Sequence, residues 1–142
     1  MRVCAGGLLV RGDELLLAKR SADRVFYPGV WDIIGGHCES GETPAETLVR
    51  ELQEEVNIRP RSFHEIAVLD EPRPAEHGQA QYHVFIVTAW GGAEQLLGVE
   101  HSELCWLRLD EALRLPLAHP DYATVFRSVL NRAGSEELLN AE

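Results

Sequence analysis

Residues Gly35 to Asn57, with the sequence GGHCESGETPAETLVRELQEEVN, decide the fold of this chain. Within the stretch, Thr43 is followed by Pro44 and then by Glu46, three residues after the threonine. A hydroxyl residue with a glutamate three residues later is a capping box, and proline is favoured at the first helical position because its missing N–H would have no partner there. Asn57 tolerates the left-handed conformation of a C-terminal cap. The pattern therefore predicts a helix that starts after Thr43 and stops near Asn57.

The expected helix carries an apolar stripe beside an acidic one. At about 100° per residue, the residues that should face the core are Ala45, Leu48, Val49, Leu52 and Val56. Glu51, Glu54 and Glu55 fall on an adjacent side, because offsets of three and four residues point the same way. A solvated acidic face is one interpretation of this pattern. If the three glutamates stay ionised in a partly buried place, however, their repulsion requires a cation between them, and carboxylate oxygens are natural ligands of magnesium.

The glycines ahead of this helix predict a loop with tight turns. Gly35, Gly36 and Gly41 lie within one short segment, and glycine allows the backbone to approach a ligand or metal closely. A glycine-rich loop alone often marks only a turn. Here the loop is joined to an acidic helix in fixed register, and the two together favour a binding site.

The rest of the chain predicts strands punctuated by helices. Apolar runs between turn signals predict strands at 3–10, 15–18, 31–34, 63–69, 82–89 and 104–109. Residues 71–78 are expected to be an exposed loop. Asp110 is expected to cap a short helix through Leu115, and Asp121–Arg132 to form an amphipathic helix that stops at Gly134. This order predicts an α+β fold, with a mixed β-sheet flanked by a helix on each face.

The composition fits one domain. The chain has 142 residues, 45% hydrophobic and 25% charged, so residues 1–142 are expected to form one domain, with a frayed tail from about residue 135. A formal net charge of −10 without a basic patch argues against a nucleic-acid polymer as partner. No apolar run could span a membrane and no signal peptide is evident, which favours a cytoplasmic location. Cys4, Cys38 and Cys105 have no metal-site spacing and are expected to be reduced, mostly buried thiols.

The stretch also resembles a family motif, the Nudix box. The match spans 23 residues and comprises Gly36, Glu42, Arg50, Glu51, Leu52, Glu54, Glu55 and Ile58. It departs only at Asn57, where the box has glycine, and asparagine is the next best residue for a left-handed cap. Trp31–Gly36 and Glu100–Trp106 resemble the flanking segments of mutator-type members. The chain is therefore identified as a Nudix hydrolase, which implies the α/β/α sandwich of the Nudix fold.

The resemblance implies a metal-dependent hydrolase of a nucleoside diphosphate linked to another group. Mg²⁺, or alternatively Mn²⁺, would be held by the Gly36 carbonyl, Glu51, Glu54, Glu55 and Glu100. The residues implied to act in catalysis are Arg50, Glu51, Glu54 and Glu100. Arg50 would orient the carboxylates through its planar fork of donors, and Glu42 would fix the loop. The catalytic base stays open between Glu54, Glu100 and Glu103.

The resemblance implies a small-molecule nucleotide as substrate. A nucleoside or deoxynucleoside triphosphate is the first choice; ADP-ribose, a nucleotide sugar, or a non-catalytic nucleotide-sensing role are the alternatives. His119 stands where the enzymes that remove oxidised guanine nucleotides carry an asparagine. Phe26 and Tyr27 are candidates for stacking on the base, and Lys19 and Arg20 for contacting a phosphate. The oligomeric state is left open, a homodimer included.

Overall fold

The structure, a computed structural model, describes residues 1–130. These residues form seven strands and four helical segments. The strands are β1 (Arg2–Arg11), β2 (Glu14–Arg20), β3 (Trp31–Asp32), β4 (Ile34–His37), β5 (Arg59–Asp70), β6 (Ala80–Gly91) and β7 (His101–Arg108). The helices are α1 (Pro44–Val56), α2 (Pro74–His77), α3 (Leu109–Ala112) and a last segment at 122–130.

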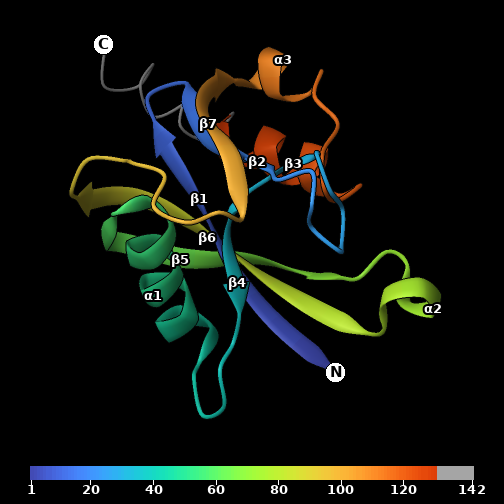
Figure 1. The fold of residues 1–142 in the computed structure, drawn as a ribbon. Helices are drawn as coiled ribbons and strands as arrows, with labels where there is room; N and C mark the ends of the chain where they lie inside the picture. The colour runs from blue at the N-terminus through green and yellow to red at the C-terminus, as the bar shows by residue number, and fades with distance from the viewer. Residues whose placement is uncertain (131–142) are drawn as a thin grey trace.

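Strand β1 is the centre of a mixed sheet (Figure 1). It runs parallel to β6 on one side and antiparallel to β4 on the other, while its C-terminal end pairs antiparallel with β2. β5 continues the sheet beyond β6, and β3 and β7 both pair with β2. The expected mixed sheet is confirmed.

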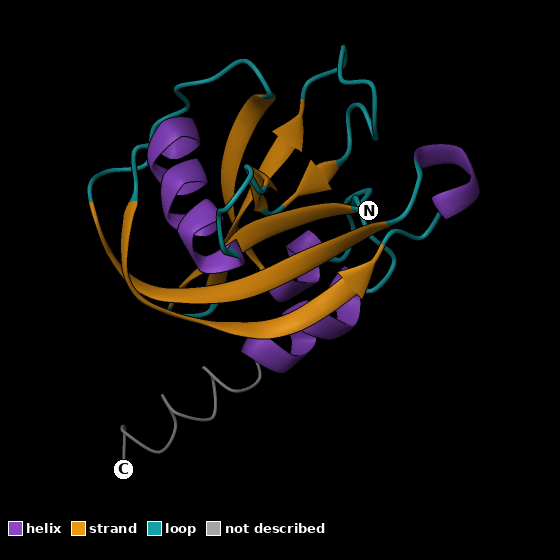
Figure 2. Ribbon diagram, turned by 90° about the horizontal axis from the view of Figure 1, so that it is seen from below, coloured by secondary structure: helices purple, strands orange, loops and turns teal. Residues whose placement is uncertain are grey.

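Helices cover both faces of the sheet, as Figure 2 shows. On one face, Leu48, Leu52 and Val56 of α1 are fully buried and belong to one apolar cluster. On the other face, the segment 122–130 contributes Phe126, also fully buried, to a second cluster. Burial of apolar surface on both faces is the main stabilising contribution to this arrangement. The expected sandwich is thereby confirmed.

Both ends of α1 follow the capping signals. The Thr43 hydroxyl accepts a hydrogen bond from the Glu46 backbone N–H at 3.2 Å, and the Glu46 carboxylate accepts one from the Thr43 N–H at 3.0 Å. Pro44 is the first helical residue, and Asn57 closes the helix in the left-handed conformation with a φ of 62°. The predicted bounds of this helix are confirmed.

The expectation that Val49 faces the core is wrong. Val49 is 39% exposed, whereas Thr47, Glu51 and Glu55 are buried together with the leucines of the helix. The buried face of α1 is therefore rotated toward the acidic side. The reason is that a later segment covers that side, since the N–H of Leu97 donates to the Glu55 carbonyl at 2.9 Å.

The expected loop at Gly35–Gly36 is instead strand, and the expected strand 31–34 is two strands interrupted at Ile33. β4 can pair with β1 because a side chain is absent at Gly35, where a Cβ atom would lie 2.0 Å from the Ala5 carbonyl oxygen. The glycines thus allow close approach within a sheet rather than a turn. The other expected strands are present with shifted bounds.

Two further expectations change in the second half of the chain. The expected exposed loop 71–78 contains the short helix α2 and begins with Glu71, which is only 4% exposed. The helix α3 begins at Leu109, so Asp110 lies in its first turn and is not its cap. The expected final helix is present at 122–130, while its predicted end, Gly134 and the tail from about 135 lie outside the described residues.

The three cysteines differ in burial. Cys4, Cys38 and Cys105 are all free thiols, but only Cys4 is buried, so the expectation of mostly buried thiols is wrong for the other two. Burial raises the pKa of Cys4 to about 11. No helix within residues 1–130 is long and apolar enough to cross a membrane.

Candidate metal and active site

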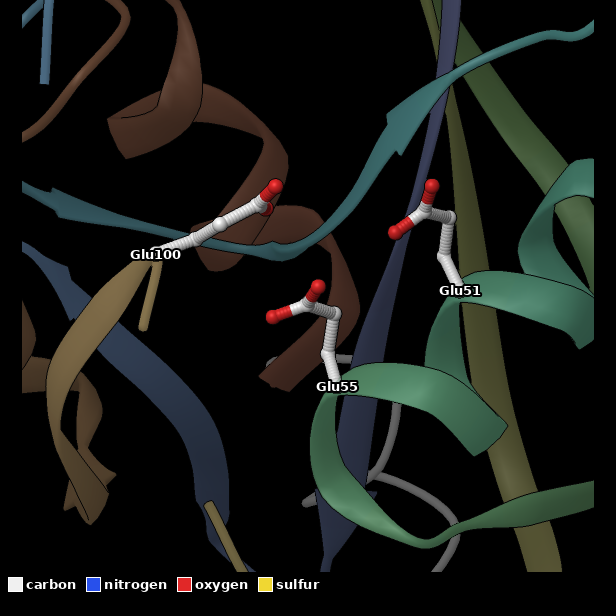
Figure 3. Close-up of side chains that lie close together, drawn as sticks. All are labelled: Glu51, Glu55 and Glu100. Atoms are coloured by element: carbon white, nitrogen blue, oxygen red, sulfur yellow. The ribbon is translucent and has the colours of Figure 1, made fainter. Parts of the chain in front are cut away.

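Three carboxylates converge at the start of β7 (Figure 3). Glu51 and Glu55 project from successive turns of α1, and Glu100 lies immediately before β7. One oxygen from each of the three lies within 4.8 Å of the others. The cluster therefore joins the helix to a segment some 45 residues later in the chain.

The cluster is built into the protein rather than left in solvent. Glu51 and Glu55 are each only 8% exposed. Two glycines make room for them, because a Cβ atom at Gly36 would lie 2.5 Å from Glu51 Oε1 and one at Gly98 would lie 2.9 Å from Glu55 Oε2. A fully solvated acidic face is thus excluded for these two glutamates.

The electrostatics of the cluster are unfavourable without a cation. Burial, followed by the charges of Glu100 and Glu51, raises the pKa of Glu55 to about 7. Burial also raises the pKa of Glu51, although Arg50 opposes this effect. Close carboxylates in a partly buried place favour the protonated form unless positive charge is supplied.

Arg50 organises the carboxylates around the helix. Its Nε donates to Glu42 at 2.7 Å, and its Nη1 donates to Glu51 at 2.9 Å and to Glu54 at 3.2 Å. The hydrogen bonds from Arg50 and Thr47 lower the pKa of Glu42 to about 2. Arg50 thus fixes the direction in which the Glu51 carboxylate points, and it ties the helix to Glu42 in the preceding loop.

Two other candidate glutamates lie apart from the cluster. The Glu54 side chain is 57% exposed and contacts Arg50, and it does not belong to the group formed by Glu51, Glu55 and Glu100. Glu103 is exposed on β7, where it pairs in register with Lys19. Of the candidates for the base, Glu100 is therefore the one that the fold brings to the buried carboxylates.

His101 belongs to this site and was not among the residues selected from the sequence. Its Nδ1 atom lies 3.8 Å from Glu55 Oε2, and both atoms are buried without a hydrogen-bond partner among the described residues. Burial lowers the pKa of His101, so its ring favours the neutral form. Its position next to Glu100 was the one available sequence signal. An orphaned, buried carboxylate oxygen among other carboxylates fits a divalent cation with oxygen ligands.

A cavity of about 320 Å³ opens beside the carboxylates. Arg24 lines it, its Nη1 lies 3.6 Å from Glu100, and its buried Nε has no partner among the described residues. Arg20 also lines the cavity, but its Nε and Nη2 donate to the Phe26 carbonyl and its Nη1 lies 3.5 Å from Asp32. Lys19 is not part of the lining. Arg24 is therefore better placed than either sequence candidate to meet an anion.

The cavity also has an aromatic part. Phe26 and Tyr27, the candidates for stacking on a base, line it. His119 lines it as well, but the Asp121 N–H donates to its Nδ1 at 3.0 Å, so its Nε2 carries the proton and donates to the Asp70 carbonyl at 2.8 Å. Both ring nitrogens of His119 are thus occupied by the backbone, and this residue shapes the cavity without a free polar atom.

Comparisons with known proteins agree with this geometry. A family model described as "NUDIX domain" matches residues 1–129. The CTP pyrophosphohydrolase of Escherichia coli (strain K12) is 32% identical over 114 residues, which cover 80% of this chain and 81% of that protein. A putative ADP-ribose pyrophosphatase of Bacillus subtilis (strain 168) is 28% identical over 84% of this chain and 64% of that protein. The crystal structure of a MutT NUDIX hydrolase from Burkholderia pseudomallei has a TM-score of 0.78 at 28% identity, covering 92% of this chain and 95% of that one.

Proposed function

Because the chain belongs to the NUDIX domain family and is a Nudix hydrolase, we propose that it is a divalent-metal-dependent pyrophosphohydrolase of nucleoside or deoxynucleoside triphosphates. Such an enzyme adds water across a phosphoanhydride bond and releases a nucleoside monophosphate and pyrophosphate. The observation that carries the proposal is the convergence of Glu51, Glu55 and Glu100 at the edge of a cavity. That cavity also holds arginine and aromatic side chains, which suit the phosphates and the base of a nucleotide.

The carboxylates would hold Mg²⁺, or Mn²⁺ in its place, together with the Gly36 carbonyl and Glu54. When bound, such a cation supplies charge neutralisation at the phosphates and activation of water. This assignment is motivated by the burial of Glu51 and Glu55, which raises the pKa of both carboxyl groups. Positive charge at this point would restore the ionised forms.

The remaining roles fall to side chains of this chain. Arg50 holds Glu51 in place through the hydrogen bond at 2.9 Å. Arg24 would donate from its free Nε to a phosphate oxygen, which the charged guanidinium suits. Glu100 would accept the proton of the attacking water at a carboxylate oxygen, because it lies on a loop that can adjust when substrate enters.

The similarity to the E. coli CTP pyrophosphohydrolase supports a triphosphate substrate. The similarity to the putative ADP-ribose pyrophosphatase of B. subtilis keeps ADP-ribose, and with it nucleotide sugars, as the second candidate. A non-catalytic sensor is disfavoured because Glu51, Glu54 and Glu55 are all retained.

A product screen tests the proposal. Purified protein would be incubated with nucleoside and deoxynucleoside triphosphates, ADP-ribose and nucleotide sugars in Mg²⁺, and the products separated by anion-exchange chromatography. The proposal expects a monophosphate and pyrophosphate from triphosphates, and neither in excess chelator. Faster hydrolysis of ADP-ribose than of every triphosphate would support the second candidate instead.

A further inference from the structure

The cavity contains a second buried carboxylate, far along the sheet from the metal-binding cluster. Glu71 directly follows the last residue of β5 and lies near α2, whereas Glu51 and Glu55 lie on α1. The helices α1 and α2 lie at opposite ends of the molecule in both ribbon views (Figures 1 and 2). Glu71 nevertheless lines the same cavity as Glu51. The cavity therefore has an acidic group at each of two distinct places.

The surroundings of Glu71 keep it ionised. The Tyr27 hydroxyl donates to Glu71 Oε1 and the Tyr82 hydroxyl to Oε2, each at 2.6 Å. Burial alone would raise the pKa of Glu71, but these two hydrogen bonds hold it below its ordinary value. Within residues 1–130 no arginine or lysine lies close enough to the carboxylate to form an ion pair, and the more distant charges of His77 and Arg2 add to the lowering of its pKa.

A buried carboxylate whose side-chain hydrogen bonds come only from two tyrosine hydroxyls has unused acceptor capacity. An ionised carboxylate offers about four lone-pair sites, and the tyrosines occupy two of them. Leaving a buried charge without further partners costs free energy. A ligand that brings N–H donors into this end of the cavity would therefore bind more tightly than one that brings carbonyl oxygens.

We propose that Glu71 selects the nucleobase, favouring bases that present an exocyclic amino group over those that present a carbonyl or a hydrogen at that position. This inference rests on the proposed triphosphate substrate, because it assigns the base end of that same site. Phe26 and Tyr27 both line the cavity, and Tyr27 donates to the carboxylate. Because the Arg2 guanidinium already lies over the Phe26 ring, Tyr27 is the better candidate for stacking on the base. The amino group donates to Glu71, whereas the carbonyl oxygen of uracil would meet the same carboxylate as a second acceptor.

Two pairs of nucleotides vary the amino group, and the second pair varies nothing else. Cytidine triphosphate differs from uridine triphosphate in that its 4-amino group becomes a carbonyl and N3 gains a hydrogen. Adenosine triphosphate carries a 6-amino group at the corresponding position, and purine riboside triphosphate replaces that group by hydrogen with no other change. A hydrogen bond to a charged group is stronger than one between neutral groups. Its loss predicts a preference on the order of 10- to 100-fold in kcat/KM for the amino-bearing nucleotide. The wild-type enzyme should prefer the amino-bearing member of each pair that it hydrolyses.

The substitution Glu71→Gln separates selection from support of the fold. Glutamine keeps the size of the side chain and adds an N–H donor, so the preference should fall to near one and kcat/KM for uridine triphosphate should rise. Glu76→Gln is the matched control, because Glu76 is an exposed carboxylate on α2 outside the cavity lining, and it should leave both ratios unchanged. A purely structural role would lower the values for both members of a pair equally.

The outcomes distinguish the inference from the function on which it rests. Hydrolysis of these triphosphates without preference in the wild type, or with an unchanged ratio in Glu71→Gln, would overturn the role of Glu71 and leave the proposed function standing. Absence of hydrolysis of any triphosphate in Mg²⁺ would overturn both. If Glu71→Gln does not fold, the wild-type ratios alone decide, since a lack of preference contradicts the inference.

Discussion

The Nδ1 atom of His101 and the Oε2 atom of Glu55 face each other at 3.8 Å, both buried and both without a hydrogen-bond partner among the described residues. Unsatisfied buried polar groups are rare in native proteins and commonly mark a missing ion or a functional role. Here they lie beside Glu51 and Glu100. A cation held by the carboxylate cluster, as proposed above, would satisfy the Glu55 oxygen of this pair.

Divalent metal should stabilise the folded protein. A ligand that binds only the folded state at a hundredfold excess over its Kd adds about 2.7 kcal/mol to the free energy of unfolding. For a chain of this length, that corresponds to a rise in Tm of roughly 5 to 10 °C. Thermal unfolding followed by circular dichroism in Mg²⁺, Mn²⁺ and chelator measures it. The rise should disappear in the double variant Glu51→Gln/Glu55→Gln, and an equal rise in that variant would place the metal elsewhere.

The pKa of Glu55 predicts a pH dependence in the absence of metal. Because this pKa is raised from 4.5 to about 7, the folded protein between those values holds a proton that the unfolded chain has lost. The contribution of Glu55 to stability therefore falls as pH rises through this window. His37 and His101, whose pKa values are lowered, act in the opposite direction.

Comparison of the wild type with the Glu55→Gln variant isolates the contribution of Glu55, because both proteins contain His37 and His101. Urea unfolding in chelator at pH 5, 6, 7 and 8 gives the free energy of unfolding of each protein. The wild type should lose stability relative to Glu55→Gln as pH rises from 5 to 7, and the difference should then level off. A difference that stays constant with pH would contradict the raised pKa.

Glu100 and Glu103 provide a second matched pair. Glu100→Gln should lower kcat by orders of magnitude with little change in Tm, because Glu100 reaches the cluster from a loop. Glu103→Gln should leave kcat near the wild-type value, because Glu103 is exposed on β7 and lies outside the cavity lining. Steady-state kinetics on the best substrate of the screen measures both. Equal, small effects would mean that the base is another residue, with Glu54 the next candidate.

The glycine beside Glu51 tests the geometry of the cluster. In Gly36→Ala the new Cβ would lie 2.5 Å from Glu51 Oε1, so the carboxylate must move and Mn²⁺ affinity should fall about 10- to 100-fold. In Gly7→Ala the Cβ would instead lie 2.8 Å from the Leu48 side chain in the core, which should lower Tm more than metal affinity. Electron paramagnetic resonance of free Mn²⁺ measures the affinities, and indistinguishable binding in Gly36→Ala would argue against Glu51 as a ligand.

The sequence predicted the helix α1 closely because its signals are local. The capping box at Thr43 and the left-handed Asn57 act within one turn of the backbone. By contrast, the burial of Glu55 depends on the segment around Leu97 and Gly98, which is remote in sequence. Periodicity alone cannot show which flank of a helix a distant segment covers.

In the site, too, residues marked by a local motif could be predicted, whereas residues placed by tertiary packing could not. Glu51 and Glu55 could be selected from a motif with fixed spacing, and Glu100 from its distance to a later strand. Glu71 could not, because it was expected in an exposed loop and its burial depends on Tyr82 of a neighbouring strand. His101 was likewise missed, since its relation to Glu55 arises only from tertiary packing.

The carboxylate cluster is proposed to support metal-dependent release of pyrophosphate from a nucleotide, and ³¹P nuclear magnetic resonance follows that release in solution. The wild type and Glu51→Gln would each be incubated with a triphosphate substrate, in Mg²⁺ and in excess chelator, while the phosphorus signals are followed with time. We expect nucleoside monophosphate and pyrophosphate from the wild type in Mg²⁺ alone. Full turnover in chelator or by Glu51→Gln, or release of diphosphate and inorganic phosphate instead, would contradict it.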